Sequence, residues 1–324
     1  MDGPAKLQLS SDGKIRHFLT IEGLSRSQLV ELLDIAEGFK SIHGQPVKKI
    51  PILRGKTVVN LFFENSTRTR TTFDIAAQRL SADLITIDIR TSSQSKGESL
   101  NDILKNLQSM QVDLFVVRHH SGGAAHFIAQ RVDSTIAVIN AGDGYHAHPT
   151  QALLDLMTMR QRAGDPSKLS VAIIGDIKHS RVARSLIHGL KGMQCTDIRI
   201  IGPPTLIPNN INTYGVSKYF DIKKGIKDVN VIVCLRLQTE RMQSSLIPSA
   251  NEFFKLFGIT NERLKYAAKN VIIMHPGPIN RGIEISDEVA DGDSSVILNQ
   301  VTNGIAVRMA VMAATLSNRT DSGE

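Results

Sequence analysis

Residues 58–80 gather hydroxyl and guanidinium groups where a predicted helix begins. We expect a buried strand to end at Phe63, and the amphipathic helix after it opens with Ser66, Thr67, Arg68, Thr69 and Arg70. A helix N-terminus carries partial positive charge and N–H groups without a helical partner, and arginine adds a fork of donors that matches phosphate oxygens. The alternative is that Ser66 only caps the helix while both arginines are solvated. Two arginines near a positive helix end favour a phosphate site.

Arginines also follow two apolar runs that we expect to form strands. Arg118 ends DLFVVR, and Arg236 ends VNVIVCLR. Open α/β sheets bind ligands at the carboxyl edge of their strands, so both are candidate ligand contacts, although each could be an ordinary exposed charge at a strand end. His148 directly precedes Pro149, which can open a helix, and a helix N-terminus disfavours the imidazolium. We therefore expect a neutral His148.

Other common site signatures are absent or weak. There is no GxxxxGK[ST] motif, and Gly175 is not followed by the GxGxxG spacing, so nucleotide-driven chemistry is not supported. Four histidines lie near carboxylates only in the loose sense that most sequences allow: His119, His120, His146 and His148. We therefore expect no metal site and no cofactor. We interpret His275 as a structural loop histidine and Cys234 as a core residue.

The elements that must position these residues alternate along the whole chain. Short β-rich runs are separated by longer stretches of helical period, which is typical of parallel sheets covered by helices. We expect strands at 57–63, 84–89, 113–118 and 135–141 in the first half. A second series starts at 170–177 and continues in DIRIIGP, VNVIVCL and NVIIMHP. The predicted fold is α/β with two domains, each a parallel sheet covered by helices.

Two further helices define the predicted domain boundaries. The segment HPTQALLDLMTMRQRAG, opened by Pro149 and closed by Gly164, links the two series. The apolar C-terminal segment GIAVRMAVMAATL has no strand after it, so we expect it to pack back on the first domain. The first domain is then 1–149 together with 304–324, and the second is 150–303.

The composition limits the classes of protein that remain. With 324 residues, 41% hydrophobic and 21% charged, the chain is neither disordered, collagen-like nor a coiled coil. No apolar run approaches the roughly 20 residues that span a bilayer. Two cysteines are too few for a disulfide framework, which favours a reducing, cytoplasmic location. The net charge of +7 forms no basic block and Trp is absent, so we expect small anionic ligands rather than nucleic acid or a membrane.

Six motifs in order carry a family resemblance. They are STRTR at 66–70, KGE at 96–98, HPTQ at 148–151, GDIKHSR at 175–181, RLQTER at 236–241 and HPGP at 275–278. In this order they resemble the transcarbamoylase family, and within it the catalytic chains of aspartate carbamoyltransferases. The resemblance runs from His17 to the C-terminal helix.

The resemblance implies a reaction and a set of site residues. The reaction is transfer of the carbamoyl group of carbamoyl phosphate to the amine of L-aspartate, in pyrimidine biosynthesis, with 1–149 binding carbamoyl phosphate and 150–303 binding aspartate. The implied carbamoyl phosphate contacts are Ser66, Thr67, Arg68, Thr69, Arg118, His148, Gln151 and the backbone of Gly277 and Pro278. The implied aspartate contacts are Lys96, Arg181, Arg236 and Gln238. Ser92, Ser93 and Lys96 would reach the site from a neighbouring subunit of a homotrimer.

The chemistry needs no nucleophilic side chain, because a neutral amine attacks a carbonyl that already has a good leaving group. Thr69, Arg118 and His148 are the expected donors to the developing oxyanion, while Arg68 stabilises the departing phosphate. These four are the implied catalytic residues.

Alternatives remain at this point. The ornithine enzyme shares STRTR and HPTQ, but its HCLP motif and SMG loop are absent here, and a dicarboxylate substrate fits Arg181, Arg236 and Lys96 better. A noncatalytic relative that binds an anion as a scaffold subunit is a second alternative. The N-terminal LQLSSDGKIRHFLTIEGL resembles a longer bacterial form that assembles with dihydroorotase or a dihydroorotase-like chain, which is therefore a possible partner.

Overall fold

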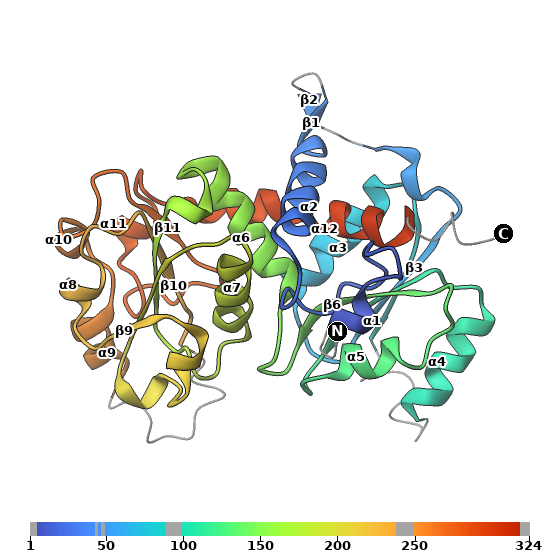
Figure 1. Cartoon of the computed structure of the whole chain (residues 1–324), viewed down its shortest axis with the longest axis horizontal. Helices are drawn as coiled ribbons and strands as arrows, with labels where there is room; N and C mark the ends of the chain where they lie inside the picture. The colour runs from blue at the N-terminus through green and yellow to red at the C-terminus, as the bar shows by residue number, and fades with distance from the viewer. Residues whose placement is uncertain (1–4, 43–44, 47–48, 89–98, 238–248, 318–324) are drawn as a thin grey trace. The chain divides into compact units, whose positions relative to one another are not determined.

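The chain forms two compact α/β units (Figure 1). The computed structural model describes residues 5–42, 45–46, 49–88, 99–237 and 249–317. One unit comprises Met1–Leu153 and Asn303–Glu324, and the other comprises Leu154–Thr302. The chain passes from one unit to the other within two helices, α6 (Pro149–Arg162) and α12 (Ile297–Ser317). We call them unit 1 and unit 2.

Unit 1 is built on a parallel sheet with the strand order β4-β3-β5-β6. Its strands are β3 (Thr57–Phe62), β4 (Asp83–Asp88), β5 (Leu114–His119) and β6 (Ala137–Asp143). Its other elements are α1 (Ala5–Gln8), α2 (Arg26–Gly38), β1 (Ser41–Ile42), β2 (Gln45–Pro46), the 3-10 helix η1 (Pro51–Leu53), α3 (Thr67–Arg79), α4 (Leu100–Ser109) and α5 (Ala124–Ala129). The four strands expected in the first half are all present.

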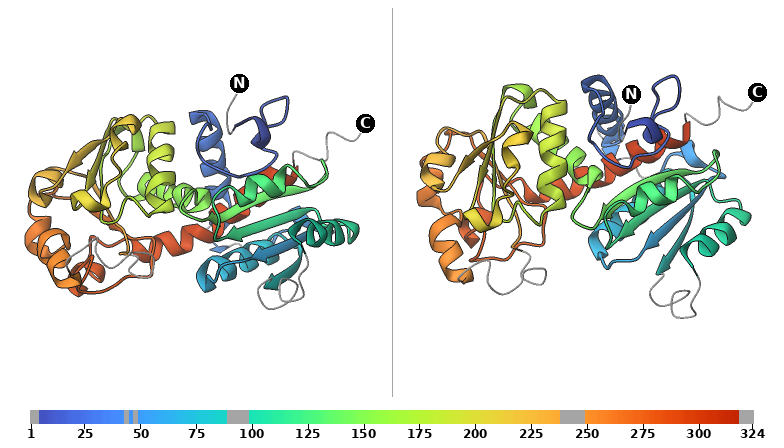
Figure 2. Two further views of the ribbon diagram at one scale, coloured as in Figure 1. Left: turned by 90° about the horizontal axis from the view of Figure 1, so that it is seen from below. Right: turned by 60° about the horizontal axis from the view of Figure 1, so that its bottom comes forward.

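The alternation of side chains along β3 explains how helices cover both faces of this sheet. Val59 and Leu61 belong to a buried cluster with the apolar side chains of α4 and α5. Asn60 points to the other face, where its Nδ2 donates to Asp74 Oδ1 of α3 over 2.7 Å. Successive residues of a strand point to opposite faces, so β3 is covered on both. Figure 2 shows the strands of unit 1 side by side with these helices around them.

A polar network ties the N-terminal segment to the edge strand β6. Phe18 forms an isolated parallel bridge with Ile139. The Oε1 atom of the buried Gln8 side chain accepts hydrogen bonds from the backbone N–H groups of Leu19 and Thr20 at 2.8 and 2.9 Å. Because an uncovered edge strand offers unpaired backbone groups, this segment extends and protects the sheet.

Unit 2 has a five-stranded parallel sheet with the order β11-β10-β7-β8-β9. Its strands are β7 (Ser170–Ile174), β8 (Asp197–Ile201), β9 (Ser217–Tyr219), β10 (Val231–Cys234) and β11 (Ile272–Met274). The helices, besides the end of α6 and the start of α12, are η3 (Pro166–Lys168), α7 (Arg181–Gly192), η4 (Pro204–Leu206), η5 (Ile211–Tyr214), α8 (Ile222–Gly225), α9 (Ala250–Phe257), α10 (Asn261–Leu264) and α11 (Asp287–Ala290). Among the described strands of unit 2, only β9 was not predicted, because this edge strand is three residues long and lacks an apolar run.

The C-terminal helix packs on unit 1, as expected. The Arg308 guanidinium of α12 lies 5.0 Å from the centre of the Phe73 ring of α3, and both side chains are buried. Arg308 also donates to the Gly304 carbonyl over 2.8 Å. The predicted α/β fold with two parallel sheets is confirmed. Among the described residues, no helix is both long and apolar enough to cross a membrane.

Candidate active site

In unit 1 the predicted phosphate-binding residues occupy the first turn of α3. Ser66 is the N-cap residue, yet its side chain makes no capping hydrogen bond and instead donates to Thr69 Oγ1 over 2.8 Å. Thr69 is buried, whereas Thr67 and Arg68 are exposed. The Ser66 hydroxyl therefore does not cap α3 in this structure. The turn presents hydroxyl, guanidinium and backbone N–H groups together, as a phosphate site requires.

Arg118 lies at the carboxyl end of β5, where the pairing with β6 becomes irregular between Val117 and His119. The side chain is 7% exposed. Its Nη1 donates to the Ala141 carbonyl over 3.0 Å, and its Nη2 lies 3.7 Å from Glu64 Oε2. Such irregularities redirect a side chain out of the regular ladder. Arg118 is thus held in place by the adjacent strand and by the segment after β3.

His148 and Gln151 lie at the start of α6, which begins at Pro149 as expected. Both side chains are buried, and the Gln151 N–H donates to the His148 carbonyl over 3.1 Å. β6 ends at Asp143, only five residues before His148. Because β3, β5 and β6 are parallel, the residues that follow them lie at one edge of the sheet. The structure therefore brings the start of α3, Arg118 and the start of α6 to the same edge of unit 1.

In unit 2 the two predicted arginines follow adjacent parallel strands. Arg181 is the first residue of α7, after β7, and is 5% exposed. Arg236 comes two residues after β10 and is half-buried. β7 and β10 pair in register, and the Leu235 N–H extends this pairing by donating to the Ile174 carbonyl over 2.8 Å. Two guanidinium groups thus follow the carboxyl ends of two neighbouring strands.

Two sequence profiles of one family together match most of the chain. The profile described as "Aspartate/ornithine carbamoyltransferase, carbamoyl-P binding domain" matches residues 16–161. The profile described as "Aspartate/ornithine carbamoyltransferase, Asp/Orn binding domain" matches residues 167–315. The chain belongs to the aspartate/ornithine carbamoyltransferase family.

Solved structures of both branches resemble this carbamoyltransferase. Aspartate transcarbamoylase from Trypanosoma cruzi in complex with carbamoyl phosphate is 28% identical, with a TM-score of 0.82 over 96% of this chain and 99% of that chain. The same enzyme in complex with N-(phosphonacetyl)-L-aspartic acid has 28% identity and a TM-score of 0.83 over 97% of this chain and 100% of that chain. Ornithine carbamoyltransferase from Pyrococcus furiosus has 25% identity and a TM-score of 0.82 over 93% of this chain and 97% of that chain.

The HPGP loop of the carbamoyltransferase follows β11 in unit 2. Gly277 has a φ of 65°, a value that suits glycine, and its N–H donates to His275 Nδ1 over 2.7 Å. The His275 N–H donates in turn to Gln300 Oε1 over 2.9 Å. The His275 ring is thus engaged in shaping the loop. The backbone of Gly277 and Pro278, predicted to contact substrate amino groups, lies in this loop.

Sequence reasoning missed Glu284, which connects the HPGP loop to the segment after β10. Its buried carboxylate accepts from the Leu237 N–H at 2.8 Å, the Asn280 N–H at 2.9 Å and Asn280 Nδ2 at 2.8 Å. Burial raises the pKa of Glu284, against the effect of these hydrogen bonds. Leu237 is the neighbour of Arg236, so Glu284 helps to hold a candidate substrate contact. No motif marks it, because its partners are 47 and 4 residues away.

Some predicted site residues lie outside the described part of the chain: Ser92, Ser93, Lys96 and Gln238. Within the described part, one group of side chains has the composition of a metal site. His126, Asp143 and His146 offer ligand atoms that all lie within 4.8 Å of one another. His146 is among the four histidines that the sequence places loosely near carboxylates, whereas no sequence pattern marks His126.

The two thiols are buried and free. Burial raises the pKa of the Cys195 thiol to about 11, and it raises the pKa of Cys234 as well. A thiol with a raised pKa is a poor nucleophile. Their placement agrees with a core role for Cys234.

Proposed function

We propose that this carbamoyltransferase transfers the carbamoyl group of carbamoyl phosphate to the amine of L-aspartate, giving N-carbamoyl-L-aspartate and phosphate. The observation that carries the choice of aspartate is the pair Arg181 and Arg236 after adjacent strands of unit 2. Aspartate has one carboxylate more than ornithine, and ornithine has one cation more than aspartate. Two arginines favour the dicarboxylate, since like charges placed together would repel ornithine.

Unit 1 would bind carbamoyl phosphate. Ser66, Thr67, Arg68 and Thr69 supply donors for the phosphate at the start of α3, where the helix dipole also favours an anion. Arg118 and the start of α6 lie at the same edge of the sheet. Carbamoyl phosphate in the Trypanosoma cruzi complex supports this ligand for the family fold. In this proposal Gln151 contacts the carbamoyl group.

The catalytic contribution would be electrostatic. The amine attacks the carbonyl carbon, a negative charge develops on the carbonyl oxygen, and the bond to the phosphate oxygen then breaks. Thr69, Arg118 and His148 would donate to that oxygen, and donors fixed in a desolvated site are worth more than the same donors in water. Arg68 would stabilise the phosphate as it leaves. The departing phosphate accepts the proton that the attacking amine loses, and no covalent enzyme intermediate is needed.

The decisive experiment offers the purified chain carbamoyl phosphate with either aspartate or ornithine and identifies the products. We expect N-carbamoyl-L-aspartate and no citrulline. Arg68→Ala should remain folded by circular dichroism but lose nearly all turnover, whereas Arg70→Ala, one residue beyond Thr69, serves as a charge-matched control and should lose much less. Citrulline as the product would assign the chain to the ornithine branch. Absence of any carbamoyl product with a folded chain would favour a scaffold role.

We also propose that the active enzyme is a homotrimer in the cytoplasm, acting in pyrimidine biosynthesis, with Ser92, Ser93 and Lys96 completing the site of a neighbouring subunit. Inactive Lys96→Ala and inactive Arg68→Ala chains, mixed after dissociation and reassembled, should regain activity, because some hybrid sites combine an intact Arg68 with an intact Lys96. Each variant dissociated and reassembled alone is the control. Hybrid trimers without activity would contradict the shared site. Co-purification from the native source would test for a dihydroorotase-like partner.

A further inference from the structure

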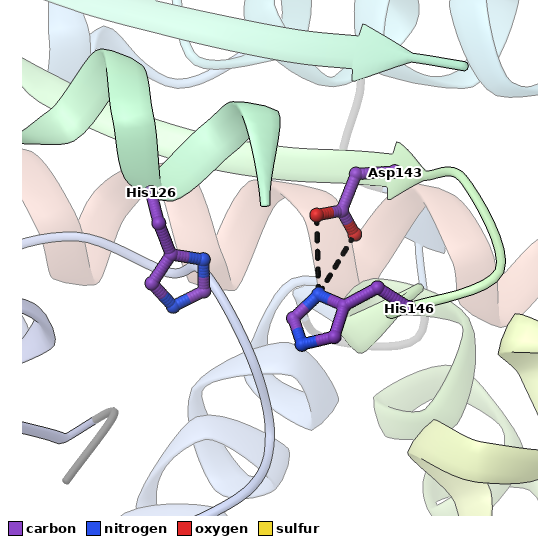
Figure 3. A group of neighbouring side chains, drawn as sticks. All are labelled: His126, Asp143 and His146. Carbon is purple, nitrogen blue, oxygen red and sulfur yellow. Dashed lines mark hydrogen bonds and ion pairs between the residues drawn. The ribbon is translucent and has the colours of Figure 1, made fainter. Parts of the chain in front are cut away.

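Three side chains in unit 1 converge beside the turn that leads to α6. His126 comes from α5, Asp143 ends β6, and His146 lies in the turn after β6. Figure 3 shows a ring nitrogen of His126 directed toward the space beside Asp143 and His146. Asp143 is fully buried, and the two histidines are partly buried. The arrangement combines two imidazoles with one carboxylate, a ligand set found in metal centres.

Asp143 is held rigidly by the surrounding backbone. Its Oδ2 accepts from the Gly123 N–H at 2.7 Å, and its Oδ1 accepts from the Ala147 N–H at 3.0 Å and Asn140 Nδ2 at 2.9 Å. Burial opposes ionisation, but hydrogen bonds from His146 and Asn140 outweigh it and lower the pKa of Asp143. The group is therefore a carboxylate at neutral pH. Gly123 is the N-cap of α5, so the same carboxylate also fixes the helix that carries His126.

The turn after β6 is equally constrained. Gly144 has a φ of 49°, and a Cβ there would lie only 2.6 Å from the Gly122 backbone nitrogen. A Cβ on Gly122 would in turn approach the His146 Cβ at 3.2 Å. The loop before α5 and the turn carrying His146 are therefore packed backbone against backbone. The backbone of these two segments has little freedom to rearrange. Ligands from the two segments can meet without such a rearrangement.

The existing distances approach those of a coordinated metal. His146 Nδ1 lies 3.1 Å from Asp143 Oδ2. Two ligands at roughly 2.0–2.1 Å from a tetrahedral zinc ion are separated by roughly 3.3 Å. An ion can therefore take the position between these two atoms with small side-chain shifts. His126 must move further, because the three ligand atoms now lie within 4.8 Å of one another, whereas the ligands of one zinc ion lie roughly 3.3 Å apart.

His126 has the properties of a ligand that is not otherwise used. Its Nδ1 is buried and has no hydrogen-bond partner in the structure. Burial, followed by the charge of the neighbouring His146, lowers the pKa of His126. Coordination needs a ring nitrogen with an available lone pair, and the buried Nδ1 has no hydrogen bond to give up. An orphaned buried nitrogen also costs stability, and a metal ion would remove that cost.

We propose that His126, Asp143 and His146 form a binding site for one divalent transition-metal ion of the zinc type. The ion binds His126, a carboxylate oxygen of Asp143 and Nδ1 of His146. Coordination uses the lone pair of His146 Nδ1, so the ion displaces the proton that lies between this atom and Asp143, and water completes the coordination. Magnesium and calcium are disfavoured because they prefer oxygen ligands. The ion would link α5 to the turn that leads to His148.

The test uses the full-length chain without an affinity tag, dialysed against a chelator. Isothermal titration with Zn²⁺ and the visible absorption of bound Co²⁺ report binding directly and do not depend on activity. We expect one ion per chain. His126→Ala and His146→Asn should each weaken binding at least about tenfold, because each removes one of three protein ligands. His120→Ala removes an exposed imidazole nearby and should bind like the wild type.

Thermal unfolding provides a second readout. Zn²⁺ should raise the melting temperature of the wild type and of His120→Ala, but not that of His126→Ala, and all three should have the same circular dichroism spectrum. Failure of the wild type to bind Zn²⁺ or Co²⁺ with one-to-one stoichiometry would overturn the site. Equal losses in His120→Ala and His126→Ala would show only nonspecific capture by surface imidazoles, and would overturn it too.

Discussion

Replacement of Glu284 tests whether one buried carboxylate holds the segment of Arg236 against the HPGP loop. The Glu284 side chain is almost fully buried and accepts three hydrogen bonds. Oε1 accepts from both the Leu237 N–H and Asn280 Nδ2, whereas Oε2 accepts from the Asn280 N–H and lies 4.0 Å from His275 Nε2. This division between the two oxygens allows different substitutions to remove different numbers of bonds.

The expected magnitudes follow from the donors left without a partner. Glu284→Ala strands two backbone N–H groups, those of Leu237 and Asn280, and each buried unpaired donor costs about 1–3 kcal/mol. We therefore expect a loss of about 2–6 kcal/mol in the free energy of unfolding, with any loss of packing in addition. Glu284→Gln can keep both bonds at Oε1 but places an amide nitrogen opposite the Asn280 N–H. Its expected loss is about 1–3 kcal/mol.

Urea unfolding followed by circular dichroism measures these free energies, with the exposed Glu288→Gln as a control for the same chemical change. If the chain has the proposed activity, both Glu284 variants should raise KM for aspartate more than KM for carbamoyl phosphate. The reason is that Glu284 holds Leu237, the residue next to Arg236. The increase in KM for aspartate should be smaller in Glu284→Gln, which can keep the bonds at Oε1, than in Glu284→Ala, which keeps none. A Glu284→Gln variant as unstable as Glu284→Ala, or an Ala variant within 1 kcal/mol of the wild type, would refute the reasoning.

Three further outcomes can be checked independently. Arg236→Ala should raise KM for aspartate about tenfold or more, because it removes a charge-assisted hydrogen bond. Separate titrations should show little change in carbamoyl phosphate binding. Equal losses for both ligands would contradict the division of roles between the two units. Because burial raises the pKa of Cys195 to about 11 and also raises that of Cys234, iodoacetamide should label neither thiol in the native chain and both in urea. Since the folded pKa of Asp143 lies below its ordinary value of 3.8, its contribution to stability is complete above that value and is lost as pH falls through the folded pKa. In metal-free buffer, the stability difference between the wild type and Asp143→Asn should therefore shrink on acidification, and a constant difference would count against the ionised carboxylate.

The fold was largely predictable because the buried strands are nearly continuous apolar runs. Such runs mark strands covered on both faces, and the segments between them have room for helices. Residues 170–177 were expected as a strand, and β7 covers Ser170–Ile174. The strand β9 was missed since only Ser217–Tyr219 pair, at the edge of the sheet, and their side chains form no apolar pattern. Edge strands are specified by their neighbours rather than by their own residues.

The candidate site was predictable where chemistry follows a strand directly. Arg118 ends an apolar run in unit 1 and Arg236 ends one in unit 2, and each therefore lies at the carboxyl edge of its own parallel sheet. Glu284 was not predictable, because its role depends on two backbone N–H groups brought together by loops. A carboxylate in a polar stretch looks the same in sequence whether it is solvated or buried. Only the folded chain distinguishes these cases.

The grouping of His126, Asp143 and His146 was missed for a different reason, and topology could have revealed it. In a parallel β–α–β unit the helix starts at the edge where the first strand ends, and the second strand ends at that same edge. α5 connects β5 to β6, so its first turn, with His126, must lie near the end of β6, where Asp143 and His146 follow. The Gly123 N–H bond to Asp143 is the direct expression of this geometry. Candidate ligands in α/β proteins should therefore be sought between helix starts and strand ends rather than by distance along the chain.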